Sequence, residues 1–537
     1  MPATLTYPGI YVEEVASGVR TISGVSTADT AFVDVFASGP MNDAQRITSF
    51  ADFERVFGGL DDLSEASYAI QQYYLNGGQI AWVVRVPGGD PQTATLDLGA
   101  AFGSAPAEGL TLSAANPGSW GNELEGAAVA VRMPDDSIAT DRFNLVVRKV
   151  RQGPGGKVEV LATEVFRNLN MTVGDRNYAR TVVNDQSQLA RVTSVGLGAL
   201  PTAATPNDTG DGPADVSAFQ PFTGGTPGTA PTGNDLIGDP DAKTGIYALD
   251  RIAPFVFNLL CLPAAANLTT DRDPTPLSGV LTAAEAYCDA KRAFFIMDIP
   301  VLVETAAQMG QYLKDLEGLT LRSDHAAVYF PRLKMQDTLQ DGRLRNVGGS
   351  GTMAGVYART DSTRGVWKAP AGTDAVLRNA QLAVRLDDLE NGGLNLLGVN
   401  VLRNFPVFGN ISWGARTLNG ADQQASEWKY IPVRRTALYI EESLYEGLKW
   451  VVFEPNDEPL WAQIRMNTGA FMNNLFRQGA FQGNTPAKAY FVKCDSETTT
   501  QNDIDRGVVN ILVGFAPLKP AEFVVIRIQQ LAGQIET

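Results

Sequence analysis

The chain has 537 residues, of which 44% are hydrophobic and 19% are charged, and its formal net charge is -16. This length exceeds one hydrophobic core and predicts about three or four domains, while the composition excludes a disordered chain. The negative charge excludes a general nucleic-acid binder, which would carry a basic surface.

The sequence shows no signals for a disulfide framework, a secretory leader or a membrane-spanning segment. The three cysteines have no paired spacing, which argues against a disulfide framework or a zinc site and is typical of a reducing compartment. The first eight residues contain neither a basic nor an apolar segment, so we expect no secretory signal. No run of about 18 apolar residues occurs, so we expect no direct insertion into a membrane.

The first predicted element is a strand at residues 10–15, where side chains alternate after a Pro-Gly pair. A small, polar stretch follows, so we expect residues 1–27 to form an N-terminal arm and its linker. Residues 28–94 predict the first part of a core, with flanking strands at 30–36 and 79–86. Two helices are expected between these strands, the first of them opened by Ser49 as a cap.

Residues 95–235 predict an inserted, mostly β outer domain. Alanine, glycine, proline and threonine dominate both of its boundaries, at about 88–118 and 196–240. Strand patterns lie between these boundaries, at 127–133, 141–150 and 157–165. Loops of such composition run over protein surfaces, so we expect an exposed domain that loops join to the core.

Residues 236–380 predict an α/β core with a largely parallel sheet, because strand patterns alternate with helix patterns. The strands are expected at 254–262, 293–299 and 325–330, and the helices at 281–291 and 301–316. Residues 348–372 are rich in glycine and predict a loop, and a further helix is expected at 375–387.

Residues 381–516 predict a C-terminal α+β domain, and residues 517–537 a C-terminal arm. Two helices with apolar stripes are expected at 436–451 and 461–475, and strands at 490–494 and 508–513. Prolines precede the final alternating segment and separate it from the domain. A strand at the end of a chain either closes its own sheet or completes a neighbour's, and the pattern leaves both open. The residues assigned to the two arms are Ile10, Tyr11, Val12, Glu13, Phe523, Val524, Val525, Ile526, Arg527 and Ile528.

The residues indicate no catalytic, cofactor or metal site. His325 is the only histidine and no G-x-S-x-G elbow accompanies it, which argues against a serine hydrolase. The run Gly348-Gly349-Ser350-Gly351 lacks the G-K-[ST] ending of a phosphate loop. Asp298, at the end of a predicted strand, is expected to cap a helix. Two classes stay open, a self-assembling structural subunit and a hydrolase-like α/β enzyme with an unrecognised site, and the lack of converging His, Cys and carboxylate groups favours the first.

Several sequence blocks, spread over nearly the whole chain, are specific when taken together. They include Tyr7-Pro8-Gly9-Ile10-Tyr11-Val12-Glu13-Glu14, Tyr74-Leu75-Asn76-Gly77-Gly78, Ala354-Gly355-Val356-Tyr357-Ala358-Arg359-Thr360-Asp361, Trp413-Gly414-Ala415-Arg416-Thr417, Phe453-Glu454-Pro455-Asn456 and Pro520-Ala521-Glu522-Phe523. With these blocks the chain resembles the contractile tail sheath proteins of bacteriophages and of related phage-tail-like injection systems. Two departures from the family's pattern, at Pro331-Arg332 and Asn346-Val347-Gly348-Gly349, affect a loop.

The resemblance implies a structural subunit and not an enzyme, with a subtilisin-like α/β core that is not a protease. It implies hexameric rings of the chain, stacked helically around an inner tube protein, with baseplate and terminal cap proteins as further partners and no nucleic acid or cofactor. The two arms are expected to pair with strands in neighbouring C-terminal domains, and contraction is expected to drive the tube through a target cell envelope. Assembly is expected in the bacterial cytoplasm, as part of a phage virion or phage-tail-like particle that lysis releases.

Overall fold

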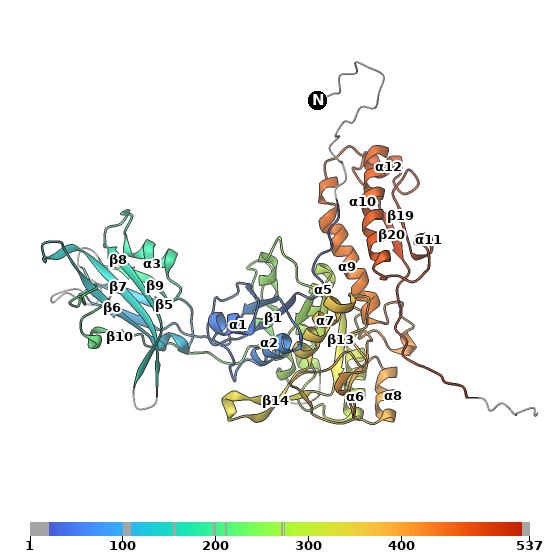
Figure 1. Cartoon of the computed structure of the whole chain (residues 1–537), viewed down its shortest axis with the longest axis horizontal. Coiled ribbons are helices and arrows are strands. Elements are labelled where there is room, and N and C mark those ends of the chain that lie inside the picture. The colour runs from blue at the N-terminus through green and yellow to red at the C-terminus, as the bar shows by residue number, and fades with distance from the viewer. Residues whose placement is uncertain are drawn as a thin grey trace, which may run out of the picture.

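The structure is a computed structural model that describes residues 21–99, 109–153, 157–196, 200–209, 212–269, 272 and 274–528. Figure 1 shows three parts along the long axis of the molecule: a β-rich module at one end, an α/β core in the middle and a unit of long helices at the other end. The predicted mixed α/β, multidomain class is confirmed.

The core is built on an eight-stranded sheet with the strand order β18-β17-β13-β12-β11-β1-β3-β2. All pairs from β17 to β3 are parallel, and β18 and β2 join the two edges antiparallel. The prediction of a largely parallel sheet is therefore confirmed. The strands are β1 (Thr30–Asp34), β2 (Gln45–Ile47), β3 (Ala81–Arg85), β11 (Leu259–Cys261), β12 (Phe294–Met297), β13 (Ala326–Phe330), β17 (Asn400–Phe405) and β18 (Gly409–Ser412).

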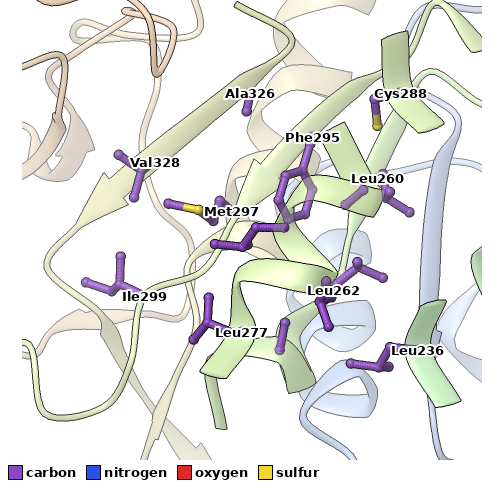
Figure 2. Packing of buried hydrophobic residues seen from close by; sticks show 14 of the residues in the cluster. Leu236, Leu260, Leu262, Leu277, Cys288, Phe295, Met297, Ile299, Ala326 and Val328 are labelled. Carbon is purple, nitrogen blue, oxygen red and sulfur yellow. The ribbon is translucent and has the colours of Figure 1, made fainter. Parts of the chain in front are cut away.

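Both faces of this sheet are buried, because successive side chains of its strands point to opposite sides. In β12, Phe295 and Met297 enter one hydrophobic cluster, which Figure 2 shows, whereas Phe294 enters the other. The first cluster is covered by α4 (Gly233–Ile237), α5 (Ser278–Lys291), α6 (Ala306–Gly318) and α8 (Asp388–Leu396). The second is covered by α1 (Phe50–Phe57), α2 (Glu65–Asn76), α7 (Ser350–Arg364) and the first half of α9 (Ile431–Gly447).

Helix α7 lies where the sequence predicts a glycine-rich loop, so that prediction is wrong. Its glycines allow a close approach to α2: a Cβ atom at Gly351 would lie 2.2 Å from the carbonyl oxygen of Ala69. A Cβ atom at Gly355, one helical turn further on, would lie 2.5 Å from the carbonyl oxygen of Tyr73. Glycines four residues apart share one helix face, and here they serve packing and not flexibility.

The prediction of a helix at 375–387 is also wrong. Part of this segment forms the short strand β16 (Gln381–Leu382), because β14 (Leu333–Asp337) offers it a free edge on the side opposite β15 (Arg343–Val347). The helix predicted at 301–316 is confirmed but begins at Ala306, where Thr305 caps its first turn.

The β-rich module folds around a hydrophobic cluster of its own, formed between two sheets. One sheet has the order β10-β6-β7-β8 and the other β4-β5-β9. We keep 95–235 as the proposed limits of this module. Its elements are β4 (Thr95–Leu98), β5 (Leu110–Ala114), β6 (Leu124–Arg132), β7 (Ile138–Gln152), β8 (Val158–Leu169), α3 (Ala179–Gln186), β9 (Ala190–Val195) and β10 (Gln220–Pro221).

The C-terminal unit is built around two long helices and a two-stranded sheet, and it begins later than the sequence suggests. Residues 400–412 lie in the core because β17 pairs with β13, so we propose that this unit starts near Ile431 and not at 381. The predicted strand at 508–513 lies slightly later, at 512–515. The elements that follow α9 are α10 (Glu458–Arg477), α11 (Pro486–Ala489), β19 (Tyr490–Lys493), α12 (Gln501–Asp505) and β20 (Leu512–Phe515).

Candidate assembly surfaces

Helix α9 connects the core and the C-terminal unit. Ile431 and Leu438 pack in the second core cluster, whereas Ile440 packs in the cluster of the C-terminal unit. Arg435 reinforces the connection with a bidentate ion pair to Asp361 of α7, at 3.0 and 2.7 Å, and both side chains are 3% exposed. The two parts are therefore joined through one continuous helix.

The first described residues run along α9 in the opposite direction. The backbone N–H of Val25 donates to the Ser443 hydroxyl at 3.2 Å, and Arg435 donates to the carbonyl oxygen of Thr27 at 2.7 Å. Ile22 packs so closely against Gly447 that a Cβ atom there would lie 2.6 Å from it. The N-terminal segment therefore leaves the fold at the C-terminal end of α9. The predicted arm residues Ile10, Tyr11, Val12 and Glu13 precede it and lie outside the described residues.

The C-terminal segment leaves from the other end of α9. Oε1 and Oε2 of Glu522 accept hydrogen bonds from Nε and Nη2 of Arg416, at 2.8 and 2.7 Å. The hydroxyl of Tyr430, the N-cap residue of α9, donates to the same carboxylate at 3.1 Å. The Arg416 side chain is fully buried and that of Glu522 is 15% exposed. Glu522 is thus held at a specific place on the core.

The electrostatics of this contact stabilise the charged form of the Arg416 guanidinium. Burial alone would lower the pKa of Arg416, but the hydrogen bonds and charge of Glu522 and the charge of Asp422 raise it above its ordinary value. Burial, followed by the charge of Glu522, raises the pKa of Tyr430 to about 12, so its hydroxyl stays a donor. Sequence reasoning placed Arg416 and Glu522 in two separate blocks and missed their contact.

Beyond Glu522, the chain presents apolar side chains to solvent. Val524, Ile526 and Ile528 are 81%, 80% and 93% exposed. The other arm residues, Phe523, Val525 and Arg527, are exposed as well. Residues 523–528 belong to no strand that the structure describes. A contiguous apolar segment of this kind is typical of an interaction site.

The sheet of the C-terminal unit has room for further strands. It consists of β19 and β20, so in the described part of the chain each strand is paired on one side only. Val492 and Val513 pack on the cluster of this unit, whereas Phe491 and Leu512 on the opposite face are each 53% exposed. The outer edges of such a sheet present backbone N–H and C=O groups without partners in the sheet, which another strand can pair with.

The residues considered for chemistry have structural roles. Nε2 of His325 faces Nη2 of Arg434 at 2.5 Å, and its Nδ1 lies 2.9 Å from Asp324, so a guanidinium takes the place that a nucleophilic hydroxyl would occupy. Asp298 accepts from the backbone N–H of Ser350 at 2.9 Å and caps α7, which confirms the predicted capping role. Among the described residues, no group of His, Cys, Asp and Glu could hold a metal ion. No described helix has the length and apolar character needed to cross a bilayer.

Comparison with known proteins confirms the resemblance to tail sheath proteins. Residues 423–530 match the family model of the phage tail sheath C-terminal domain. A tail sheath protein of Vibrio phage KVP40 is 27% identical over 203 residues, which are 37% of this chain and 29% of that relative's length.

Solved structures share the fold over nearly the whole chain. The sheath complex of the extracellular contractile injection system PVC, in its contracted state, matches with a TM-score of 0.56 and 20% identity over 98% of each chain. The contracted helical sheath of the anti-feeding prophage gives a TM-score of 0.55 and 23% identity, over 98% of this chain and 100% of that one. A sheath tail protein of Listeria innocua gives 0.58 and 13%, over 93% and 96%.

Proposed function

We propose that this chain is the structural subunit of a contractile sheath, in a phage tail or a phage-tail-like injection system. Copies polymerise around an inner tube and contract to drive it through a target envelope. The observation that carries the proposal is the agreement of fold with sheath subunits over 98% of the chain. The match of residues 423–530 to the sheath C-terminal domain supports it independently.

Strand exchange supplies the links between copies in this proposal. Residues 523–528 add to a free edge of the β19–β20 sheet of a neighbour, and residues 10–13 act in the same way at the other end of the chain. Burying Val524, Ile526 and Ile528 contributes about 1.5–3 kcal/mol each, and each new backbone hydrogen bond about 1 kcal/mol. Association costs about 4–15 kcal/mol, so one arm is marginal and the repeated links of a polymer stabilise each other.

The further partners follow from the same proposal. Hexameric rings of this chain stack around the tube protein, and baseplate and terminal cap proteins close the two ends. The C-terminal unit faces the tube and the inserted module lies outside. Assembly takes place in the bacterial cytoplasm, and the particle is released by lysis.

Electron microscopy of the purified chain, with and without its tube protein, tests this function. The informative variant ends at Glu522 and so lacks the exposed apolar segment but keeps the contact with Arg416. We expect tubular particles from the full-length chain and only folded, unassembled subunits from the variant, with an unchanged melting temperature. The matched control, Leu389→Ser, alters a leucine that is 86% exposed on α8 and should assemble normally. Contractile sheaths from the shortened chain would show that the segment is not an intersubunit strand.

The same proposal includes the lack of hydrolytic chemistry. Because His325 faces Arg434, no serine is activated by it, and a serine-reactive probe should give no stoichiometric labelling. Labelling of one serine that disappears in His325→Ala would overturn this part.

A further inference from the structure

The C-terminal segment changes its support just before it becomes exposed. Backbone hydrogen bonds first hold it to the C-terminal unit: Ala516 donates to Ala489 at 2.8 Å, and Gln482 donates to Ala516 at 2.9 Å. Six residues later, the Glu522 side chain is held by Arg416, which lies in the loop after β18. The chain therefore leaves the C-terminal unit and is fastened a second time, to the core.

Arg416 is itself tied to the central sheet. Its backbone N–H donates to Oδ1 of Asn400 at 2.6 Å, and its carbonyl oxygen accepts from Nδ2 of Asn400 at 2.7 Å. Asn400 is fully buried on β17 and also donates to the carbonyl oxygen of Val328 on β13, at 3.1 Å. Glu522 is thus connected through two residues to strands in the eight-stranded sheet.

The geometry of the pair is suited to resist a pull. Two parallel hydrogen bonds join the planar guanidinium to the carboxylate, and such forked pairs combine strength with a fixed direction. The remaining Nη1 of Arg416 donates to the carbonyl oxygen of Asn395 at 2.8 Å and to Asp422 at 3.0 Å. These bonds keep the guanidinium in place when force acts on the arm.

Without this contact, a pull on the arm would reach the backbone hydrogen bonds of Ala516 and then β20, which directly precedes Ala516 in the chain. In the described part of the chain, β20 is bound on one side only, to β19, through a short antiparallel ladder of hydrogen bonds. The contact at Glu522 lies between the exposed segment and β20 and stops the pull before it reaches the small sheet.

We propose that Glu522 and Arg416 form an anchor through which tension on the C-terminal arm passes into the eight-stranded sheet of the core and bypasses the C-terminal unit. The tension arises from a second copy of this chain bound to residues 523–528, so this role rests on the proposed function. The anchor also fixes the point from which the arm departs. Glu522 and Arg416 are positioning residues for the arm.

Hydrogen exchange of three variants tests the anchor in unassembled subunits. Glu522→Gln removes the charge, Arg416→Lys removes the fork but keeps the charge, and Lys519→Gln is the control, because it alters an exposed charge in the same segment. We expect the amide of Ala516, which donates to the carbonyl oxygen of Ala489 six residues before Glu522, to exchange at least tenfold faster in the first two variants and within twofold of the wild type in the control. Circular dichroism verifies that all three fold. Unchanged exchange in Glu522→Gln and Arg416→Lys would overturn the anchor.

The path of the tension is tested in assembled particles before and after contraction. The amides of β20 should stay protected after contraction in the wild type and lose protection at least tenfold in Glu522→Gln, although both are equally protected before it. Equal protection of β20 after contraction would overturn the path. If the wild-type chain forms no sheaths, the proposed function fails, whereas the measurement on single subunits still decides whether the anchor exists.

Discussion

Removal of the Asp361 carboxylate should weaken the connection between the core and the C-terminal unit. Asp361 on α7 neutralises Arg435 on α9, with both side chains 3% exposed and their closest atoms 2.7 Å apart. In Asp361→Ala the guanidinium keeps only the carbonyl oxygen of Thr27 and the ring of Tyr357, which lies 4.7 Å away. A buried charge that loses its partner costs about 3–5 kcal/mol, so we expect a loss of this size in the free energy of unfolding.

Urea denaturation of the wild type and the variant measures this loss, and hydrogen exchange locates it. The exchange of residues 431–440 should accelerate, because Arg435 holds this half of α9 to α7. The control is Asp374→Ala, which removes the ion-pair partner of Arg364, the last residue of α7. That ion pair is 3.2 Å long with side chains 56% and 71% exposed, so its loss should cost no more than about 1 kcal/mol. If Asp361→Ala costs no more than the control, the reasoning about the buried pair is refuted.

Three further predictions concern other parts of the fold. Burial raises the pKa of Glu285 from 4.5 to about 7, so the folded protein binds this proton more tightly than the unfolded chain and loses stability as pH rises between these values. Glu285→Gln should therefore be more stable than the wild type by about 1–3 kcal/mol at pH 8 and equal to it near pH 4, in denaturation experiments at the two pH values. Gly351→Ala should lower the free energy of unfolding by about 2 kcal/mol or more because α2 and α7 must separate, whereas Gly469→Ala, whose Cβ would meet nothing within 4 Å, should be neutral or gain up to about 1 kcal/mol. Limited proteolysis should cut first between Gly196 and Pro240 and leave assembled particles intact, and early cuts within α9 would contradict this order.

The elements with strong local patterns were predictable from the sequence. The strands around Phe295 and Val328 are short apolar runs between helical patterns, and that alternation indicates a parallel sheet buried on both faces. Helix α7 was not predictable in this way, because Gly351 and Gly355 favour a loop until α2 is known to pack against them. Strand β16 forms only because β14 has a free edge.

The contact between Arg416 and Glu522 could not be predicted because 106 residues separate them. No periodicity or spacing reports on such a pair, and each residue by itself is typical of a solvated surface charge. The apolar character of residues 523–528, in contrast, is evident from the sequence because it depends on no other part of the chain, and their pairing with a neighbour stays a prediction.

The two terminal segments depart from opposite ends of one helix. Ile22 lies against Gly447, the last residue of α9, and Glu522 is bonded to Tyr430, its N-cap. Because α9 has 17 residues, the two departure points are about 25 Å apart, and a helix hardly stretches. In a network of copies joined at these points, each copy is a rigid bar with a pivot at either end. Such a lattice changes its dimensions only when these rigid units rotate. Any shortening along its axis is therefore accompanied by an increase in its diameter.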